Sequence, residues 1–353
     1  MSEKVIQATT TAIAPLRIGV IGVGRIGRMH AELLAHQVRG AAVGAVYDVH
    51  LPAARDVAAG LGVPAAASVD ELLAGDLDAV AICSTADTHA ELLVAAAQAG
   101  KAVFCEKPIS LDLREVDRAL AAVEAAGVPF QIGFNRRFDP AHAAVRAAVA
   151  SRAIGAPHLV RISSRDPEPP SQAYLEASGG LFLDMMIHDF DMARYVTGSE
   201  VIEVFARGAV RVLRSQGSTG QADDVDTAIV TLVHEDGCLT AIDNSRRAVY
   251  GYDQRVEVFG SDGMASSENP LAHTGVVYTA DGVQRPALPL FFLERYVQSY
   301  VREWEAFVDS VQSGAPPVVS ARDARAPLVI GLASWRSLRE RRPVRIAELD
   351  SCG

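Results

Sequence analysis

The stretch Leu16–Gly27, which reads LRIGVIGVGRIG, decides the fold of the N-terminal half of the chain. Its first six residues are a short apolar run of the kind that forms a buried parallel strand. The run leads directly into the pattern G-x-G-x-x-G at residues 22–27, and the residues from Arg25 to His36 are expected to form a helix. A strand, a glycine-rich turn and a helix in this order predict the start of a doubly wound α/β sheet.

Each glycine of this turn has a separate physical reason. Gly22 permits the tight turn, Gly24 lets a pyrophosphate approach the backbone, and Gly27 lets the helix pack closely on the strand. The N-terminus of the helix would then face the phosphates. The turn is therefore predicted to bind a dinucleotide, with Arg25 and Ile26 among its contacts.

Asp48 follows a second expected strand, Ala42–Tyr47. A carboxylate at this place can accept hydrogen bonds from the hydroxyls of an adenosine ribose and would repel a 2′-phosphate. The next residues, Val49 and His50, include no arginine, so the predicted cofactor is NAD rather than NADP. The alternative is that Asp48 only caps the turn that follows it.

Two later strands of this half also end in polar residues. Ser84 and Thr85 come directly after one apolar strand, and Glu106, Lys107 and Pro108 come after the next. Ligands bind off the carboxyl ends of strands in such a sheet, so these residues are expected to line the cofactor groove. Pro108 keeps Lys107 extended, which projects its side chain from the strand tip. There its charge would stabilise a developing alkoxide, although an exposed Glu–Lys pair is the ordinary alternative.

Gly179–Tyr195, GGLFLDMMIHDFDMARY, is expected to form one helix that carries a narrow polar stripe. At about 100° per residue, Asp184, His188, Asp191 and Tyr195 fall on one face between apolar neighbours. In one interpretation this is a helix with its polar side in water. In a second, Asp184 holds His188 in one tautomer and raises its basicity, so that the imidazole exchanges a proton with a substrate. In a third, the two side chains bind a metal ion.

The composition limits the class of protein. The chain has 353 residues and a net charge of −10, which does not favour nucleic acid or an anionic membrane as a partner. Its four cysteines are scattered without a C-x-x-C motif, which indicates a reducing compartment and a cytoplasmic protein. The first residues contain no apolar core of a signal peptide, and no stretch reaches the roughly 18 apolar residues of a membrane span.

The second half of the chain reads differently from the first, because alternating, β-branched stretches predict a series of strands and two long helices. The strands are expected at 201–214, 227–234, 238–245 and 255–259, and the helices at 292–313 and 321–339. Strands that follow a βα half argue for two domains of different class. The predicted division is a loose tail at 1–15, a dinucleotide-binding domain at 16–133 and a substrate-binding and oligomerisation domain at 134–353. One face of the large sheet would need a partner, so an oligomer is expected.

Four motifs occur in a fixed order along the chain: G-x-G-x-x-G at residues 22–27, E-K-P at 106–108, GFNRRFDP at 133–140, and the stretch 179–195. This set resembles the glucose–fructose oxidoreductase/inositol dehydrogenase family over nearly the whole chain. The resemblance implies an α/β protein, with an NAD-binding Rossmann domain followed by an α+β domain that has a large, open, mostly antiparallel sheet. It also implies that the helix at 179–195 lies over the nicotinamide and that the protein is a homotetramer.

The resemblance implies roles for individual residues as well. Lys107, Asp184 and His188 match the catalytic lysine, aspartate and histidine of the family. The implied substrate contacts are Lys107, Arg137, Asp184, His188, Asp191 and Tyr252. The predicted cofactor contacts are Gly22, Gly24, Arg25, Ile26, Gly27, Asp48, Ser84, Thr85, Glu106 and Lys107. No metal ion is expected, because a nicotinamide accepts hydride without one.

Two further stretches, 164–170 and 244–260, resemble the inositol dehydrogenases within this family. The second stretch is dense in arginine and tyrosine, which would either donate to a polyhydroxylated ring or simply face water. The resemblance implies NAD-dependent oxidation of myo-inositol to 2-keto-myo-inositol. Ser164 stands where some relatives have a histidine, so scyllo-inositol, chiro-inositol or an aldose sugar is the alternative substrate. A non-catalytic NAD-binding regulator is the alternative from another class of function.

Overall fold

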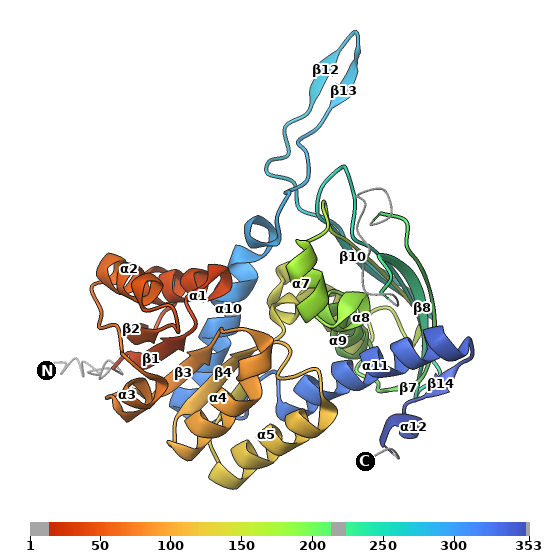
Figure 1. Cartoon of the computed structure of the whole chain (residues 1–353). Helices are drawn as coiled ribbons and strands as arrows, with labels where there is room; N and C mark the ends of the chain where they lie inside the picture. The colour runs from red at the N-terminus through yellow and green to blue at the C-terminus, as the bar shows by residue number, and fades with distance from the viewer. Residues whose placement is uncertain (1–13, 213–223, 351–353) are drawn as a thin grey trace, which may run out of the picture.

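The computed structural model describes residues 14–212 and 224–350 and shows two domains side by side (Figure 1). The first domain is built on a wholly parallel sheet of five strands in the order β2-β1-β3-β4-β5. Its strands are β1 (Leu16–Ile21), β2 (Ala41–Tyr47), β3 (Ala79–Ile82), β4 (Ala102–Glu106) and β5 (Phe130–Gly133). Its helices are α1 (Arg25–His36), α2 (Leu51–Leu61), α3 (Val69–Ala74), α4 (Ala86–Gln98) and α5 (Leu113–Ala126). The strand order reverses between β1 and β3, which is the place where such sheets bind ligands. The predicted Rossmann domain is confirmed.

The second domain is built on a sheet of seven strands in the order β11-β10-β6-β9-β8-β7-β14. Neighbouring strands of this sheet are antiparallel except β6 and β9, which are parallel. Its strands are β6 (Pro157–Arg165), β7 (Val201–Ala209), β8 (Thr227–His234), β9 (Leu239–Ser245), β10 (Asp253–Gly260), β11 (Gly263–Ser267) and β14 (Val344–Arg345). The mostly antiparallel sheet predicted for this half is confirmed. The end of the strand expected at 201–214 and most of the expected N-terminal tail lie outside the described residues.

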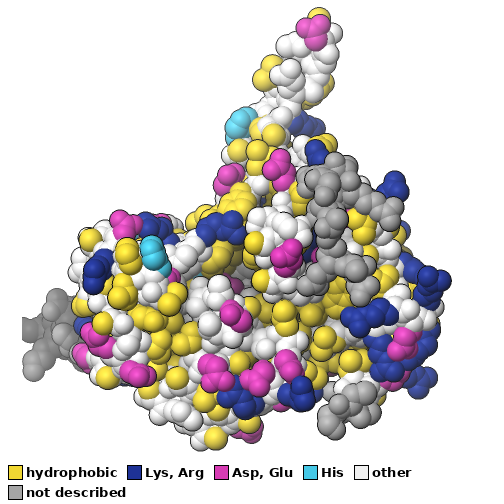
Figure 2. Space-filling view, in the orientation of Figure 1, with side chains coloured by type: hydrophobic (Ala, Val, Ile, Leu, Met, Phe, Trp, Pro, Cys, Tyr) yellow, Lys and Arg dark blue, Asp and Glu magenta, His cyan; other side chains and the backbone are white. Residues whose placement is uncertain are grey.

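Helices cover one face of this sheet. α6 packs on β10 and β11, α9 on β6, and α11 on β7. The helices of this part are η1 (Asn135–Phe138), α6 (Pro140–Ala150), α7 (Gln172–Ala177), α8 (Gly180–Asp184), α9 (Ile187–Thr197), α10 (Phe292–Ser313), α11 (Ala321–Glu340) and α12 (Ala347–Asp350). A two-stranded arm, β12 (Val277–Thr279) and β13 (Gly282–Gln284), projects from the body of the molecule (Figure 1), and Figure 2 shows hydrophobic side chains on it.

The other face of the seven-stranded sheet carries exposed side chains in the part of the chain that the structure describes. Side chains alternate between buried and exposed along β8, β9 and β10, as expected for a sheet with one covered face. Several of the exposed positions are apolar: Ile229, Leu239, Phe259 and Met264 are each about half exposed or more. Phe259 and Met264 are paired across β10 and β11, so they share this face.

Helix α10 crosses the predicted boundary between the domains. Its residues follow the strands of the second domain in sequence, but Tyr296, Trp304 and Phe307 pack in one hydrophobic cluster with β1, β4 and α1. Figure 1 shows α10 beside α1 for this reason. The helix therefore covers one face of the first sheet and ties the two domains together. The division at residue 133 stays a prediction, and α10 is an exception to it.

The expected helix over Gly179–Tyr195 is interrupted, which corrects the prediction of a single stripe. α8 ends at Asp184, α9 begins at Ile187, and Met185 and Met186 form a turn between them. The amide of Met186 donates to the carbonyl of Leu181 at 2.9 Å, a wider turn than the α-helical spacing. Asp184 and His188 therefore project from two short helices rather than from one continuous face.

Candidate active site

The glycine-rich turn between β1 and α1 has the geometry that its sequence predicts. Gly22 has φ +87°, and a side-chain carbon on Gly27 would lie only 1.8 Å from the carbonyl oxygen of Gly22. A side-chain carbon on Gly24, by contrast, would have no atom of the described residues within 4 Å. Gly24 at the N-cap of α1 has no side chain, and no capping bond is found among the described residues, so the backbone amides of the first turn are available to phosphate oxygens. The open space at Gly24 and the uncapped amides fit the pyrophosphate of a dinucleotide.

Asp48 is held at the end of β2 by two backbone amides. Its Oδ2 accepts from the amide of Val23 at 2.8 Å, and its Oδ1 accepts from the amide of His50 at 2.8 Å. The carboxylate thus caps the turn that follows it, as the alternative interpretation holds, and it also touches the glycine-rich turn. Both contacts place it beside the region where a ribose would lie.

The tip of β3 is positioned by a histidine that the sequence analysis missed. The ring nitrogens of His89 lie 3.0 Å from the carbonyl oxygen of Ser84 and 2.8 Å from that of Pro108. The Ser84 hydroxyl pairs with that of Thr88 at 2.7 Å. Thr85 stands at the N-cap of α4 without a side-chain capping bond. The tips of β3 and β4 are therefore joined through one buried imidazole.

Glu106 at the tip of β4 is fixed from the interior. Trp304 Nε1 donates to His30 Nδ1 at 2.8 Å, so the proton of the neutral His30 ring is on Nε2, and Nε2 donates to Glu106 Oε1 at 2.8 Å. The amide of Lys107 donates to Glu106 Oε2 at 3.2 Å. The alternative of an exposed Glu–Lys surface pair is therefore wrong. His30 and Trp304 come from α1 and α10, and no local signal in the sequence connects them.

Lys107 projects from the first domain toward the second. Its Nζ donates to the backbone carbonyl of Asp184 at 2.8 Å and lies 3.9 Å from Asp184 Oδ1. Burial lowers the pKa of Lys107 from its usual value, and the nearby Asp184 and Glu106 carboxylates oppose that shift. The peptide bond between Lys107 and Pro108 is cis.

Asp184 is held by three donors from different parts of the chain. Tyr174 donates its hydroxyl proton to Oδ1 at 2.8 Å, Arg246 Nη1 donates to Oδ2 at 3.3 Å, and Lys107 is the third partner. Within the part of the chain that the structure describes, no hydrogen bond joins Asp184 to His188. The expectation that Asp184 orients His188 is thus not met, because the interruption after Asp184 turns its carboxylate toward Lys107 and Arg246.

His188 lies beside the same group of residues, in an environment that disfavours its charged form. Its Nδ1 is buried and has no hydrogen-bond partner among the described residues. The ring of Phe134 meets the imidazole edge-on, with 5.9 Å between the ring centres. Burial, followed by the positive charges of Lys107 and Arg136, lowers the pKa of His188 well below 6.5. The predicted rise in basicity is therefore wrong, and the ring is neutral at neutral pH.

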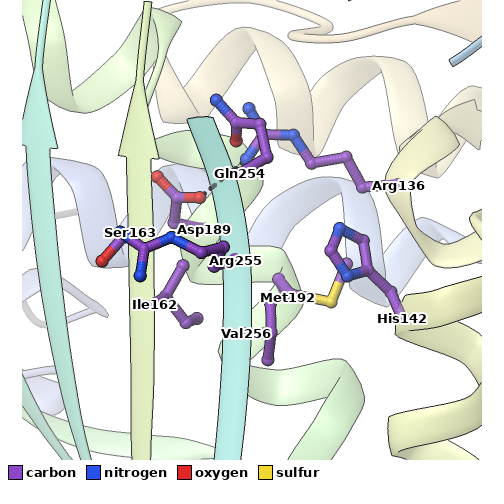
Figure 3. A pocket seen from close by; sticks show the side chains of 9 residues that line it. All are labelled: Arg136, His142, Ile162, Ser163, Asp189, Met192, Gln254, Arg255 and Val256. Carbon is purple, nitrogen blue, oxygen red and sulfur yellow. Dashed lines mark hydrogen bonds and ion pairs between the residues drawn. The ribbon is translucent and has the colours of Figure 1, made fainter. Parts of the chain in front are cut away.

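Arg136 and its partners form a buried polar layer, and Figure 3 shows Arg136 with Asp189. Arg136 donates to Asp189 Oδ1 at 2.7 Å, to the Ser164 hydroxyl at 3.1 Å and to the Tyr252 hydroxyl at 3.4 Å. Figure 3 shows the ion pair of Arg136 with Asp189, and Gln254 and His142 line the same small cavity. Ser164 is completely buried, so it belongs to this supporting layer. A contact between Tyr252 and substrate stays a prediction. The Tyr252 hydroxyl accepts from Arg136, so it lies in the same buried layer.

Arg137 and Asp191 bind each other rather than remaining free for a ligand. Arg137 Nε and Nη2 donate to the two carboxylate oxygens of Asp191 at 2.8 and 2.6 Å, and Nη2 also donates to Asp323 at 2.8 Å. The Arg137 guanidinium lies over the ring of Tyr195, 5.3 Å from its centre. The predicted substrate contacts of Arg137 and Asp191 stay predictions. The geometry favours a structural role, in which Arg137 joins Asp191 of α9 to Asp323 of α11.

Several residues around Asp184 and His188 were not predicted from the sequence. They are Tyr174, Asp166, Arg136, Asp189 and Arg246. Tyr174 lies on the short helix α7. Arg136 stands next to the predicted Arg137, and both are buried. Arg246 lies in a stretch already noted for its density of arginine and tyrosine, and only the fold could separate it from the exposed Arg247.

The described residues contain no group of three or more metal-ligating side chains that could hold a metal ion. In the same residues, no helix combines the length and the apolar character needed to cross a membrane. The glycine-rich turn, the acid at the tip of β2 and the residues gathered at the tip of β4 together define a dinucleotide-binding oxidoreductase of two domains.

Comparison with known proteins gives the family. Residues 16–134 match the family described as "Oxidoreductase family, NAD-binding Rossmann fold", and residues 142–266 match the "GFO/IDH/MocA C-terminal domain". The chain belongs to this GFO/IDH/MocA family and is an NAD-dependent oxidoreductase.

Similar proteins cover almost the whole length of the chain. A myo-inositol 2-dehydrogenase from Thermotoga maritima is 48% identical over 95% of this chain and 99% of its own. An inositol 2-dehydrogenase from Rhizobium meliloti is 43% identical over 94% of this chain and 99% of its own. A solved structure of scyllo-inositol dehydrogenase from Lactobacillus casei, with NAD(H) and scyllo-inositol bound, is 30% identical, covers 94% of this chain and 99% of its own, and has a TM-score of 0.85.

Proposed function

We propose that this protein is an inositol 2-dehydrogenase, which oxidises a ring hydroxyl of myo-inositol to give 2-keto-myo-inositol with NAD as the acceptor. The observation that carries the proposal is the meeting of Lys107 from the first domain with Asp184 and His188 from the second. They meet beyond the tip of β4, next to the cofactor side of the sheet. The two relatives from Thermotoga maritima and Rhizobium meliloti, named as inositol dehydrogenases, support the choice of a cyclic polyol.

Removal of the substrate hydroxyl proton is assigned to His188. NAD, when bound, accepts the hydride from the reacting carbon, so the chain has to remove only the hydroxyl proton. A neutral imidazole accepts that proton, and the lowered pKa of His188 keeps the ring neutral. General base action of this kind typically contributes about 10²–10⁴-fold.

Lys107 is assigned to stabilising charge on the substrate, and Asp184 is assigned to positioning Lys107. The ammonium group of Lys107 stabilises the negative charge that develops on the substrate oxygen. Asp184 holds Lys107 through its carbonyl and its carboxylate, and Tyr174 and Arg246 hold Asp184 in turn. Asp184 therefore positions the lysine rather than the histidine. This differs from a relay in which the carboxylate orients the imidazole.

The substrate alternatives differ by one hydroxyl. The relatives carry the names of both myo-inositol and scyllo-inositol dehydrogenases, so scyllo-inositol, chiro-inositol and aldoses stand as alternatives. A non-catalytic NAD-binding regulator would not need Lys107 and a neutral His188 beside the cofactor. A homotetramer and a cytoplasmic location belong to the same proposal, and the exposed apolar residues of the open sheet face support assembly with further copies of the chain.

The test measures NADH formation by absorbance with NAD or NADP and a panel of inositols and aldoses. We expect activity with NAD and myo-inositol. His188→Ala should lower kcat by about 10²–10⁴-fold with unchanged affinity for NAD, while His36→Ala, at an exposed histidine of α1, should leave both unchanged. Activity only on another polyol would change the substrate, and bound NAD without activity on any polyol would favour the regulator.

A further inference from the structure

One buried histidine of the first domain has no part in the proposed chemistry, although it bonds the residue before the lysine of the site. His30 lies on α1, three residues after Gly27, and its side chain is completely buried. The rings of Phe104, Tyr300 and Trp304 meet its imidazole edge-on, with 5.4, 5.4 and 5.6 Å between ring centres. Since these rings come from β4 and α10, two further elements fix the orientation of the imidazole.

The two hydrogen bonds of His30 determine which ring nitrogen carries the proton. An indole nitrogen can only donate, so His30 Nδ1 accepts from Trp304 Nε1, at 2.8 Å, and carries no proton. The proton of the ring is therefore on Nε2, which donates to Glu106 Oε1 at 2.8 Å. Trp304 thus holds the imidazole in the tautomer that can donate to the carboxylate.

Glu106 transmits this constraint to Lys107. Its Oε2 accepts from the amide of Lys107 at 3.2 Å. Gly133 lies opposite Glu106 in the register of β4 and β5, and a side-chain carbon there would lie 3.2 Å from the same oxygen, so this side of the carboxylate is confined. The Glu106 side chain is 14% exposed, so it could turn toward solvent without the bond from His30. Burial lowers the pKa of Lys107, and the charges of Asp184 and then Glu106 oppose that shift.

We propose that His30 is a positioning residue for the reaction: by donating to Glu106 it keeps the glutamate carboxylate against Lys107, which holds the lysine in place and supports its positive charge. This inference rests on the proposed function, since it requires Lys107 to stabilise a developing alkoxide. His30 is completely buried, so it acts through Glu106 and Lys107 and not by contact with substrate. The alternative is a histidine that only stabilises the core.

His30 also connects the elements that hold the two reactants. Its helix, α1, begins at the glycine-rich turn where the pyrophosphate is expected, and Lys107 follows directly after β4. Trp304, the donor to His30, belongs to α10, which packs with both of these elements. The imidazole therefore fixes the place of the lysine relative to the cofactor turn. Placement matters for the rate, because a displacement of about 1 Å can lower it about 10²-fold.

The experiment compares His30→Leu with His30→Gln and with the control His36→Leu, at an exposed histidine of the same helix. Leucine fills the space without a donor, whereas glutamine keeps a donor for Glu106. We measure kcat and KM with NAD and myo-inositol, the Kd for NAD and the melting temperature. We expect His30→Leu to lower kcat about 10- to 100-fold, the range of a hydrogen bond to a charged group, with smaller changes in KM and in the Kd. His30→Gln should recover much of this loss, and His36→Leu should resemble the wild-type protein.

The pH profile separates a role through Lys107 from a role in the core. Burial, and then the charges of Lys107 and Arg136, lower the pKa of His188. A lysine that has lost its place or its charge lowers this pKa less, so the acid limb of kcat/KM should move to higher pH in His30→Leu, as it should in Lys107→Met. In the double variant the change at His30 should move the limb no further, because effects that act through one residue do not add.

Trp304→Phe gives the answer even if His30→Leu does not fold. It keeps an aromatic ring in the cluster and removes the indole donor, so kcat should fall and the limb should move in the same direction. Phe307→Leu, which removes an aromatic ring from the same cluster, should lower only the melting temperature. If the limb moves in Lys107→Met but stays in place in His30→Leu and Trp304→Phe, this inference alone is overturned. A protein that oxidises no polyol would overturn the proposed function and the inference together.

Discussion

Gly24 and Gly27 lie three residues apart in one turn, yet alanine should have opposite effects at the two positions. A side-chain carbon on Gly27 would lie 1.8 Å from the carbonyl oxygen of Gly22, where real contacts are essentially never under 3.0 Å. The clash is with backbone, so strand and helix have to separate. Overpacking of this kind costs about 1–3 kcal/mol or more. At about 2–4 °C for each kcal/mol, the Gly27→Ala protein should melt at least several degrees lower without any cofactor.

Gly24→Ala should leave the free protein intact and weaken its binding of cofactor. Gly24 has φ −62°, which alanine adopts readily, and within residues 14–212 and 224–350 no atom lies within 4 Å of the new methyl group. Glycine-to-alanine changes at such positions stabilise by about 0.4–1 kcal/mol, so the melting temperature should stay the same or rise slightly. The methyl group would occupy the space that the pyrophosphate approaches, and we expect the Kd for NAD to rise at least about tenfold, which is about 1.4 kcal/mol.

Two measurements check this pair: thermal unfolding of each variant without nucleotide, and calorimetric titration of each with NAD. The wild-type protein is the reference for both measurements, and each glycine variant is the control for the other. The geometric reasoning would be refuted by a Gly24→Ala protein that loses stability yet binds NAD as before, or by a Gly27→Ala protein that melts normally.

Three further predictions concern the site and the assembly. Lys107→Met should lower activity and move the acid limb of the kcat/KM profile to higher pH. The lysine charge depresses the pKa of His188, and the active form of this base exists above that pKa. An acid limb that stays in place or moves to lower pH would contradict the assignment. Asp191→Asn should lower the melting temperature, because the buried Arg137 loses its two bonds to Asp191 and keeps only Asp323, a loss of about 1.5–3 kcal/mol for hydrogen bonds to a charged group, whereas a raised KM with unchanged melting would restore the predicted substrate contact. Phe259→Glu, on the open sheet face, should reduce the mass measured by light scattering, and an unchanged mass would show that this face is not the interface between subunits.

Much of the first domain could be predicted because its signals are local. One short segment contains the apolar run of β1, the glycines after it and Asp48. Each of them serves dinucleotide binding in the same way wherever this pattern occurs. The bounds of α10 could be read as well, since its apolar residues recur with the helical period and Gly314 ends it with φ +71°. The strands of the second domain followed from alternation and β-branched residues for the same reason.

The candidate site was only partly predictable, because periodicity describes one helix at a time. The spacing of Asp184 and His188 is correct for a single helix, but the turn at Met185 and Met186 breaks that helix. The preference for this turn depends on packing against distant residues, and a pattern of apolar positions does not contain that information. One consequence is that Asp184 bonds Lys107 and Arg246 instead of His188.

The sequence by itself determined the class of the first domain, the preference for NAD, and the set of polar residues from which a site could be built. The tertiary structure alone decided which of those residues meet. It placed α10 on the first sheet, paired Arg137 with Asp191, and surrounded His188 with burial and positive charge that lower its pKa. The reason is physical: hydrogen bonds, ion pairs and desolvation act between residues that are close in space, and in this chain the partners of the site come from segments far apart in sequence.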